Sequence, residues 1–172
     1  SSGGVRRNAL SDFTNVRSNG KIAMKLPEHV SLVNARICDE NMDFLLTTEL
    51  GKAIRFSVNK VRIFKGRDST GVRGIKLAAN DNVVSMAVIH HVDVTSEERA
   101  AYFRMRRAIT GDETGENTET SSTLSQERYA ELSAIEEWIL AITASGFGKR
   151  SSAHEYRVSG RGGQGITAAN LT

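Results

Sequence analysis

The strongest constraint on the fold of this 172-residue chain is that its sequence repeats. One anchor, a glycine followed four residues later by an arginine, occurs at residues 3–7, 51–55 and 146–150. A second anchor, a glycine turn that leads into an apolar stretch, occurs at residues 18–26, 69–77 and 161–166. Gly20 and Gly71 are 51 positions apart, and Gly71 and Gly162 are 91 apart. A period near ~50 residues predicts a propeller or a similar array, with about 40 residues inserted before the last copy.

The content of one period predicts β-strands, because β-branched and apolar residues cluster between turns. The predicted strands lie at residues 29–38, 44–48, 52–58, 74–77, 82–89, 138–143 and 147–152. Gly51 ends a tight turn between two of them, and residues 144–146 repeat that hairpin turn. The single proline, Pro27, is expected in a loop between blades. We therefore expect an all-β fold of propeller or pinwheel blades, each of about four antiparallel strands.

The stretch between the second and third copies predicts a helical insertion. Thr95 precedes acidic residues in the pattern of a helix start, and residues 97–109 are predicted to be helical. A second short helix is predicted from Ser125 to about residue 134, after a polar, mobile loop at residues 111–123. The alternative is an irregular excursion with little fixed structure. The predicted organisation is blades at 1–92, an acidic helical insertion at 93–135 and an incomplete blade at 136–172.

Charge is distributed unevenly along the chain. The whole chain carries 23 Lys and Arg against 20 Asp and Glu, a net charge of +3. Residues 1–92 carry a net +6, residues 93–137 a net −6, and residues 138–172 a net +3. Basic segments that flank an acidic insertion are typical of a protein with a polyanionic partner, although a solvated surface of mixed charge is the plainer explanation.

The composition excludes several classes of protein. No apolar run is long enough to cross a membrane, and the first residues do not resemble a secretion signal. The only cysteine, Cys38, cannot form an internal disulfide and is typical of a reducing, cytoplasmic compartment. Four suitably spaced ligands for a structural zinc ion are absent, so we expect no metal site.

No catalytic constellation is found in the sequence. Residues 148–149, Gly-Lys, lack the Ser or Thr that ends a phosphate-binding P-loop. His90 and His91 are adjacent, so on a strand they would point to opposite faces and could not bind one ion together. Ser152, His154 and Glu155 are too close in one extended segment to converge as a triad. All four histidines, including His29, are expected on the surface or in loops.

Two glycine-rich basic turns, residues 65–74 and 157–165, are the most informative functional signal. Glycine lets backbone N–H groups approach a phosphate, and arginine binds a phosphate bidentately. Each turn alone is better explained as a connection with solvated cations. Because the turns recur in successive repeats, stacked blades would align them into a basic stripe that a DNA duplex can follow.

The residues resemble a known family, the C-terminal domain of the bacterial DNA gyrase A protein. The resemblance covers most of residues 3–92 and 136–170. Its most specific stretches are residues 20–26, 65–75, 146–150 and 155–157. The signature box of that family, Gln-Arg-Arg-Gly-Gly-Lys-Gly, has its nearest match at residues 159–165, which keep the glycines and one arginine.

The resemblance implies a six-bladed β-pinwheel whose blades exchange strands and whose basic outer rim is wrapped by duplex DNA. It also implies that this chain is part of a larger type II topoisomerase protein that introduces negative supercoils with ATP. The expected partners are duplex DNA, the rest of gyrase A and gyrase B, with no membrane. No cofactor is expected in this piece, because ATP and Mg would be bound by other domains, and whether the piece counts as an enzyme is left open.

The repeated basic turns and the resemblance together select ten cations as candidate phosphate contacts. These are Arg6, Arg7, Lys21, Arg55, Lys65, Arg67, Arg73, Lys149, Arg150 and Arg161. One alternative function is the corresponding domain of topoisomerase IV, which wraps DNA less. Another is a propeller that serves as a protein-interaction platform and docks partners through the acidic insertion.

Overall fold

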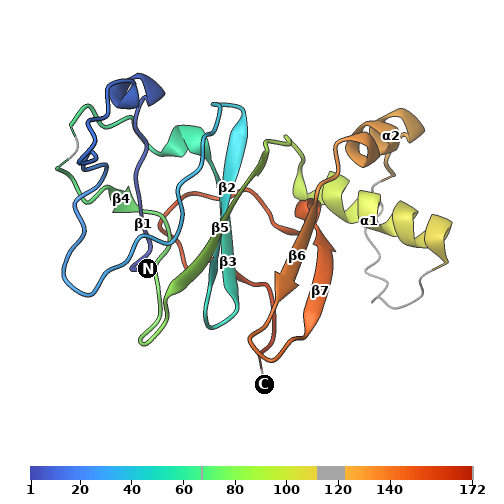
Figure 1. Cartoon of the computed structure of the whole chain (residues 1–172). Coiled ribbons are helices and arrows are strands. Elements are labelled where there is room, and N and C mark those ends of the chain that lie inside the picture. The colour runs from blue at the N-terminus through green and yellow to red at the C-terminus, as the bar shows by residue number, and fades with distance from the viewer. Residues whose placement is uncertain (67, 112–122, 172) are drawn as a thin grey trace. The chain divides into compact units, whose positions relative to one another are not determined.

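The structure is a computed structural model that describes residues 1–66, 68–111 and 123–171 (Figure 1). The chain divides into two compact units, Ser1–His91 with Val158–Thr172, and Val92–Arg157. The division predicted from the sequence, at 1–92, 93–135 and 136–172, follows the repeats and stays a prediction. None of the helices in the described ranges is long and apolar enough to cross a bilayer.

The first unit is built on a four-stranded antiparallel sheet in the order β5-β2-β3-β8. Its strands are β2 (Met42–Thr48), β3 (Lys52–Ser57), β5 (Val83–His90) and β8 (Ile166–Thr167). The predicted hairpin between β2 and β3 is confirmed, and its turn uses Gly51 at a φ of +75°. The number of strands also agrees with the blade expected from one period of the sequence.

One face of this sheet carries the core of the unit. Alternate residues of β2 and β3 point into it, and Phe44 and Phe56 meet edge to face with ring centroids 5.8 Å apart. The buried members of the core are Val5, Phe44, Leu46, Ile54, Phe56, Val58, Val61, Ile75 and Val83. Val5 belongs to the first copy and Ile75 to the second, so the core joins successive copies.

Successive repeats exchange strands, as the resemblance implied. The short strand β1 (Gly4–Val5) of the first copy pairs with β4 (Val72–Arg73), which lies within the second anchor of the second copy. In the same way, the start of β3 pairs with β8, which begins at the last residue of the second anchor of the third copy. Each exchange is followed by an isolated parallel bridge, Arg7–Ile63 in one case and Arg55–Val158 in the other, at equivalent positions of the two copies. The two exchanges are therefore structurally equivalent.

The structure corrects the alignment of the third copy. Gly71 and Gly165 have φ values of +87° and +72°, and a Cβ atom on either would lie 2.3 Å from the carbonyl oxygen of Val5 or Ala53. Val5 and Ala53 are themselves equivalent in the strand exchange. The residue that matches Gly71 is therefore Gly165, 94 positions later, and the match to Gly162 was wrong.

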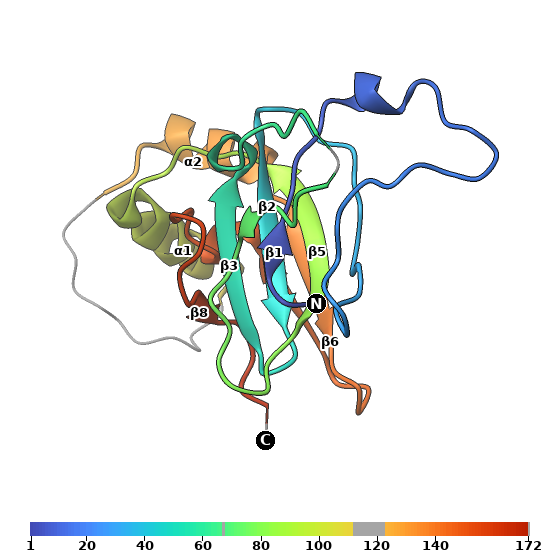
Figure 2. The ribbon, with the colours of Figure 1, turned by 90° about the vertical axis from the view of Figure 1, so that its left-hand side faces the viewer.

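Two predicted strands are absent. Residues 29–38 form no strand, and none of the described strands pairs with them. Residues 74–77 also form no strand. The N–H groups of Gly74 and Ile75 both donate to the carbonyl oxygen of Gly3, and that of Lys76 donates to Gly163, so the strand pairing ends with β4. The loop that carries the 3-10 helix η1 (Leu10–Phe13) and Pro27 extends away from the sheet of the first unit (Figure 2).

The second unit contains the predicted helical insertion and the third hairpin. The helices are α1 (Ser96–Thr110) and α2 (Gln126–Ala134), and the hairpin strands are β6 (Trp138–Ile142) and β7 (Gly148–Ser152). These elements confirm the predicted helices and hairpin. Of the loop predicted at residues 111–123, positions 112–122 lie outside the described residues.

Side chains at the helix starts explain why the insertion is helical. Thr95 and Glu98 form a reciprocal capping box on α1, and Ser125 caps α2. The pKa of Glu98 is lowered, mainly because its carboxylate accepts a hydrogen bond from the Thr95 backbone N–H. A second hydrogen bond, from the guanidinium of Arg128, lowers it further. Equivalent serines, Ser57 and Ser152, also cap the 3-10 helices η2 (Val58–Lys60) and η3 (Ala153–Glu155) after β3 and β7.

His154 was expected on the surface or in a loop, and the structure places it in the core of the second unit. Its side chain is 3% exposed, and its Nε2 lies 3.0 Å from the carbonyl oxygen of Leu132. The ring of Tyr102 meets it edge to face at 5.3 Å and stacks with Tyr129 at 5.1 Å. Burial is also the main reason that the pKa of Tyr102 rises to about 12. His154 therefore joins η3 to the helices of the insertion.

Candidate nucleic-acid interface

The two basic turns predicted from the sequence meet in the first unit. The N–H of Gly162 donates to the carbonyl oxygen of Gly74 at 2.6 Å, and the N–H of Lys76 donates to that of Gly163 at 2.8 Å. The guanidinium of Arg161 donates to the carbonyl oxygens of Lys60 at 2.8 Å and Arg73 at 3.2 Å. Turns that are almost a hundred residues apart in sequence are thus held together by backbone bonds.

We call the cations at this junction the turn cluster: Lys60, Arg73, Lys76 and Arg161. All four are exposed. Within the described residues, no carboxylate lies within 4.0 Å of any of them. The carbonyl bonds of Arg161 fix its direction without neutralising its charge, so the cluster keeps a full positive charge at the surface.

The three predicted cations of the first copy, Arg6, Arg7 and Lys21, are partly buried. Arg6 donates through Nε to Asn8 at 3.0 Å and through Nη1 to the carbonyl oxygen of Ser69 at 2.5 Å. Lys21 donates to the carbonyl oxygen of Asp12 and lies 6.0 Å from the ring centroid of Phe13. Arg6 therefore contacts the basic turn at residues 65–74, whereas Lys21 is held within its own loop.

Arg55 lies inside the fold. Its side chain is 3% exposed, and its Nε donates to the carboxylate of Asp43 at 2.7 Å. A second guanidinium nitrogen donates to the carbonyl oxygen of His90 at 2.9 Å, while His91 Nδ1 lies 2.8 Å from the other oxygen of Asp43. A guanidinium that is buried and neutralised in this way cannot reach DNA, so Arg55 leaves the candidate set.

The arginines at the same repeat position as Arg55 are also engaged. Arg7 is only 14% exposed and lies 3.7 Å from the carboxylate of Glu40. Arg150 is exposed, and its guanidinium lies 4.6 Å from the ring centroid of Trp138, over which Arg106 lies at the same distance. In the β6–β7 hairpin Trp138 pairs with Ser152, as Asp43 pairs with Ser57 in the β2–β3 hairpin. Trp138 therefore occupies the position of Asp43.

The remaining predicted cations are at turns. Lys65 is exposed, and Arg67 lies outside the described residues. Lys149 is exposed, with its Nζ 3.9 Å from the carboxylate of Glu155. Lys60 and Lys76 are outside the ten cations selected from the sequence, although they lie on either side of the turn at residues 65–74. Lys76 lies two residues after the turn at 65–74 and could have been found from the sequence, whereas Lys60 joins the cluster through a contact between distant residues.

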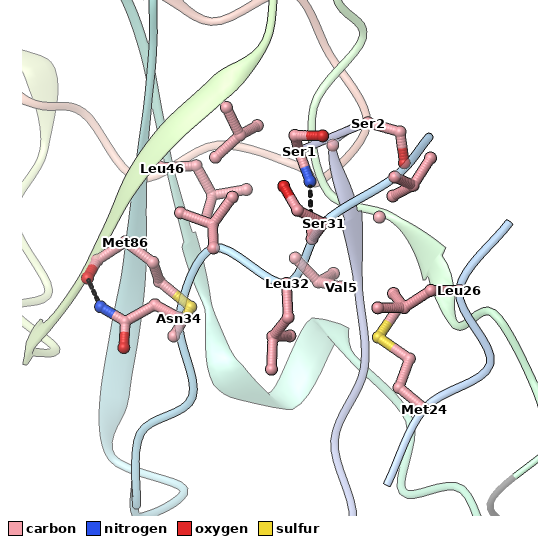
Figure 3. Close-up of a pocket in the computed structure, with 15 residues that line it drawn as sticks. Ser1, Ser2, Val5, Met24, Leu26, Ser31, Leu32, Asn34, Leu46 and Met86 are labelled. Carbon is pink, nitrogen blue, oxygen red and sulfur yellow. Dashed lines mark hydrogen bonds between the residues drawn. The ribbon is translucent and has the colours of Figure 1, made fainter. Parts of the chain in front are cut away.

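The first unit has a pocket of about 60 Å³ lined by its N-terminal residues, by Met24, Leu26 and residues 30–34, and by β2 and β5 (Figure 3). Met24, Leu32, Leu46 and Met86 are among its apolar lining, and no charged side chain lines it. In the part of the chain that the structure describes, no group of three or more His, Cys, Asp or Glu could hold a metal ion.

The repeats match a known protein family. A family model described as "DNA gyrase C-terminal domain, beta-propeller" matches residues 1–39, 43–90 and 137–172. The matched ranges cover most of the chain, and the residues between them include the helical insertion.

Curated relatives extend the comparison. The DNA gyrase A protein of Granulibacter bethesdensis is 50% identical over 187 residues, which cover 99% of this chain and 20% of the relative. The DNA gyrase A protein of Rickettsia bellii is 44% identical over 168 residues, with 95% and 19% covered. The chain therefore spans about a fifth of the length of these relatives.

Solved structures with the same fold are more distant in sequence. The C-terminal domain of DNA topoisomerase IV superposes with a TM-score of 0.64 at 19% identity, covering 96% of this chain and 38% of that one. The DNA gyrase A C-terminal domain superposes with a TM-score of 0.62 at 20% identity, covering 96% and 40%. These likenesses support the propeller fold.

Proposed function

Because the chain belongs to the DNA gyrase C-terminal domain family, we propose that it binds duplex DNA through contacts of the turn cluster with backbone phosphates. The observation that carries the proposal is the junction of Arg73 and Arg161, which come from successive repeats and have no carboxylate within 4.0 Å among the described residues. Contacts with phosphates position a duplex without reading its bases, so the binding is independent of sequence.

The placement of the cluster suits a curved duplex. The exchange between the second and third copies brings their basic turns side by side, so further copies joined in the same way would extend the cations along a rim. Each phosphate that the protein neutralises releases condensed counterions, which makes the affinity depend steeply on salt. The chain would thereby serve as part of the DNA-wrapping domain of a gyrase A protein.

The activity of the whole assembly is part of the proposal. The relatives are DNA gyrase A proteins, and this chain corresponds to about a fifth of their length. We infer that the parent protein acts in the cytoplasm with gyrase B. Other domains would bind ATP and Mg and would cleave the DNA. The topoisomerase IV alternative has weaker support, because that likeness is one of fold at 19% identity.

Charge reversal in the turn cluster tests the proposed DNA binding. We expect Arg73→Glu with Arg161→Glu to weaken duplex binding at least about tenfold and to lower the slope of log affinity against log salt by about two. The control is Arg17→Glu with Arg36→Glu, because both arginines are exposed and lie outside the cluster. Equal losses for the two double variants would mean that net charge alone attracts the duplex.

A further inference from the structure

Two arginines from successive repeats share the ring of Phe64. The guanidinium carbon of Arg62 lies 4.4 Å from the ring centroid, and that of Arg6 lies 5.1 Å from it. Phe64 is 7% exposed, Arg6 is partly buried and Arg62 is exposed. Arg62 is outside the ten cations selected from the sequence, and the turn cluster does not include it either.

Backbone bonds of the strand exchange hold this arrangement in place. The N–H of Phe64 donates to the carbonyl oxygen of Arg7 at 2.9 Å, and the side-chain amide of Asn8 donates to that of Phe64 at 2.9 Å. Asn8 also accepts from Nε of Arg6, whose Nη1 reaches the carbonyl oxygen of Ser69. Arg6 is therefore oriented by three partners before any ligand arrives.

The pair of guanidinium groups is not neutralised. Among the described residues, no carboxylate lies within 4.0 Å of Arg6 or Arg62. The Nη2 atom of Arg6 is buried and has no hydrogen-bond partner there. Two like charges beside one ring repel each other, and a bound anion would relieve that repulsion.

The next repeat offers a natural comparison. Ser159 is equivalent to Phe64, because its N–H donates to the carbonyl oxygen of Arg55 just as that of Phe64 donates to Arg7. By the same register, Arg157 is equivalent to Arg62, and Ile54 is equivalent to Arg6. The next repeat thus keeps one arginine but lacks both the ring and the second cation.

We propose that Arg6 and Arg62, held on the ring of Phe64, form a binding site for one phosphate group of the DNA backbone. The inference rests on the proposed duplex binding and adds to it a defined site and a positioning residue, Phe64. A stacked guanidinium keeps its N–H donors at the edge of its plane, where a phosphate can accept them. Orienting both cations in advance lowers the entropy lost on binding.

The test compares Arg62→Ala with its matched control, Arg157→Ala, in the full 172-residue chain. Both changes remove one exposed arginine at the same repeat position. We expect Arg62→Ala to weaken binding of a short blunt duplex about fivefold and to lower the salt slope by about one. Arg157→Ala should weaken binding less than about twofold and leave the slope within error.

Variants of Phe64 separate positioning from stability. Phe64→Leu should lower the salt slope as Arg62→Ala does, whereas Phe64→Tyr keeps the ring and should restore both slope and affinity. Thermal unfolding is followed in parallel, because Phe64→Leu also removes buried surface. A variant that lowers the melting temperature but leaves the salt slope unchanged would show a purely structural role and overturn the proposal.

The remaining outcomes distinguish this site from the proposed function itself. If the native chain binds duplex and Arg62→Ala binds like Arg157→Ala, the site is rejected and the turn cluster stands. If the native chain binds no duplex at low salt, both proposals fail. Inorganic phosphate at matched ionic strength should displace the duplex no better than chloride does, and stronger displacement would assign the site to free phosphate instead.

Discussion

Gly71→Ala is expected to lower the free energy of unfolding by about 3 kcal/mol, and Gly165→Ala by a similar amount. Both glycines have a positive φ, and a Cβ atom on either would lie 2.3 Å from a backbone carbonyl oxygen of the preceding copy. A backbone atom cannot move away as the end of a side chain can. The substitution would therefore push apart the strand exchange that joins two repeats.

A matched control isolates the close approach. Gly20 is equivalent to Gly71 and has a similar φ of +80°, but a Cβ there would meet nothing within 4 Å. Gly20→Ala should cost only the ~1 kcal/mol of a left-handed backbone conformation. Urea unfolding of the three variants measures the difference. Equal losses at Gly20 and Gly71 would mean that backbone conformation, not the contact between repeats, sets the cost.

Asp43→Ala is expected to destabilise the protein by about 3–5 kcal/mol, because it leaves the buried guanidinium of Arg55 without a counter-charge. Asp43 is fully buried and accepts from Arg55 at 2.7 Å and from His91 at 2.8 Å. The desolvation of an unpaired charge is far more costly than the loss of a surface ion pair. Chemical denaturation at neutral pH measures the loss.

The control for this substitution is Glu40→Ala. The carboxylate of Glu40 is 72% exposed and lies 3.7 Å from Arg7, so its removal should change stability by less than about 0.5 kcal/mol. The variant Asp43→Leu with Arg55→Met should recover much of the stability, since it removes both charges. Its salt slope for duplex binding should equal that of the native chain. A lower slope would return Arg55 to the set of phosphate contacts.

The repeated arginine shows how one pattern can point to two roles. A glycine followed four residues later by an arginine identifies the repeats, and these arginines, including Arg55 and Arg150, are also among the ten candidate phosphate contacts. In the second copy the arginine pairs with buried Asp43, and in the third it lies over Trp138. A residue that recurs because the blade needs it is not thereby a ligand contact.

Local patterns were sufficient for several elements. The β2–β3 and β6–β7 hairpins and both helices of the insertion were predicted from turn glycines, alternation and capping residues, because such elements are stabilised by neighbours in sequence. Residues 29–38 had the same strand-forming content and form no strand. A strand needs a partner, and composition does not report whether the partner is present.

Contacts between distant residues explain the other differences. His154 looked like a loop residue, but the helices of the insertion bury it against Tyr102. The spacing in the sequence aligned Gly162 with Gly71, and only the close approach of Gly165 to Ala53 shows that Gly165 is the equivalent residue. Both outcomes depend on packing that no local pattern contains.

The sequence by itself determined the repeat, the blade-like strand content, the helical insertion and the basic turns, since each depends on residues close together in the chain. Only the tertiary structure decided which cations are free to bind an anion. Strand exchange brings Arg73 beside Arg161 and Arg6 beside Arg62, while burial pairs Arg55 with Asp43. The charge of an arginine is a property of the residue, but its availability depends on the carboxylates, rings and carbonyl groups that folding places around it.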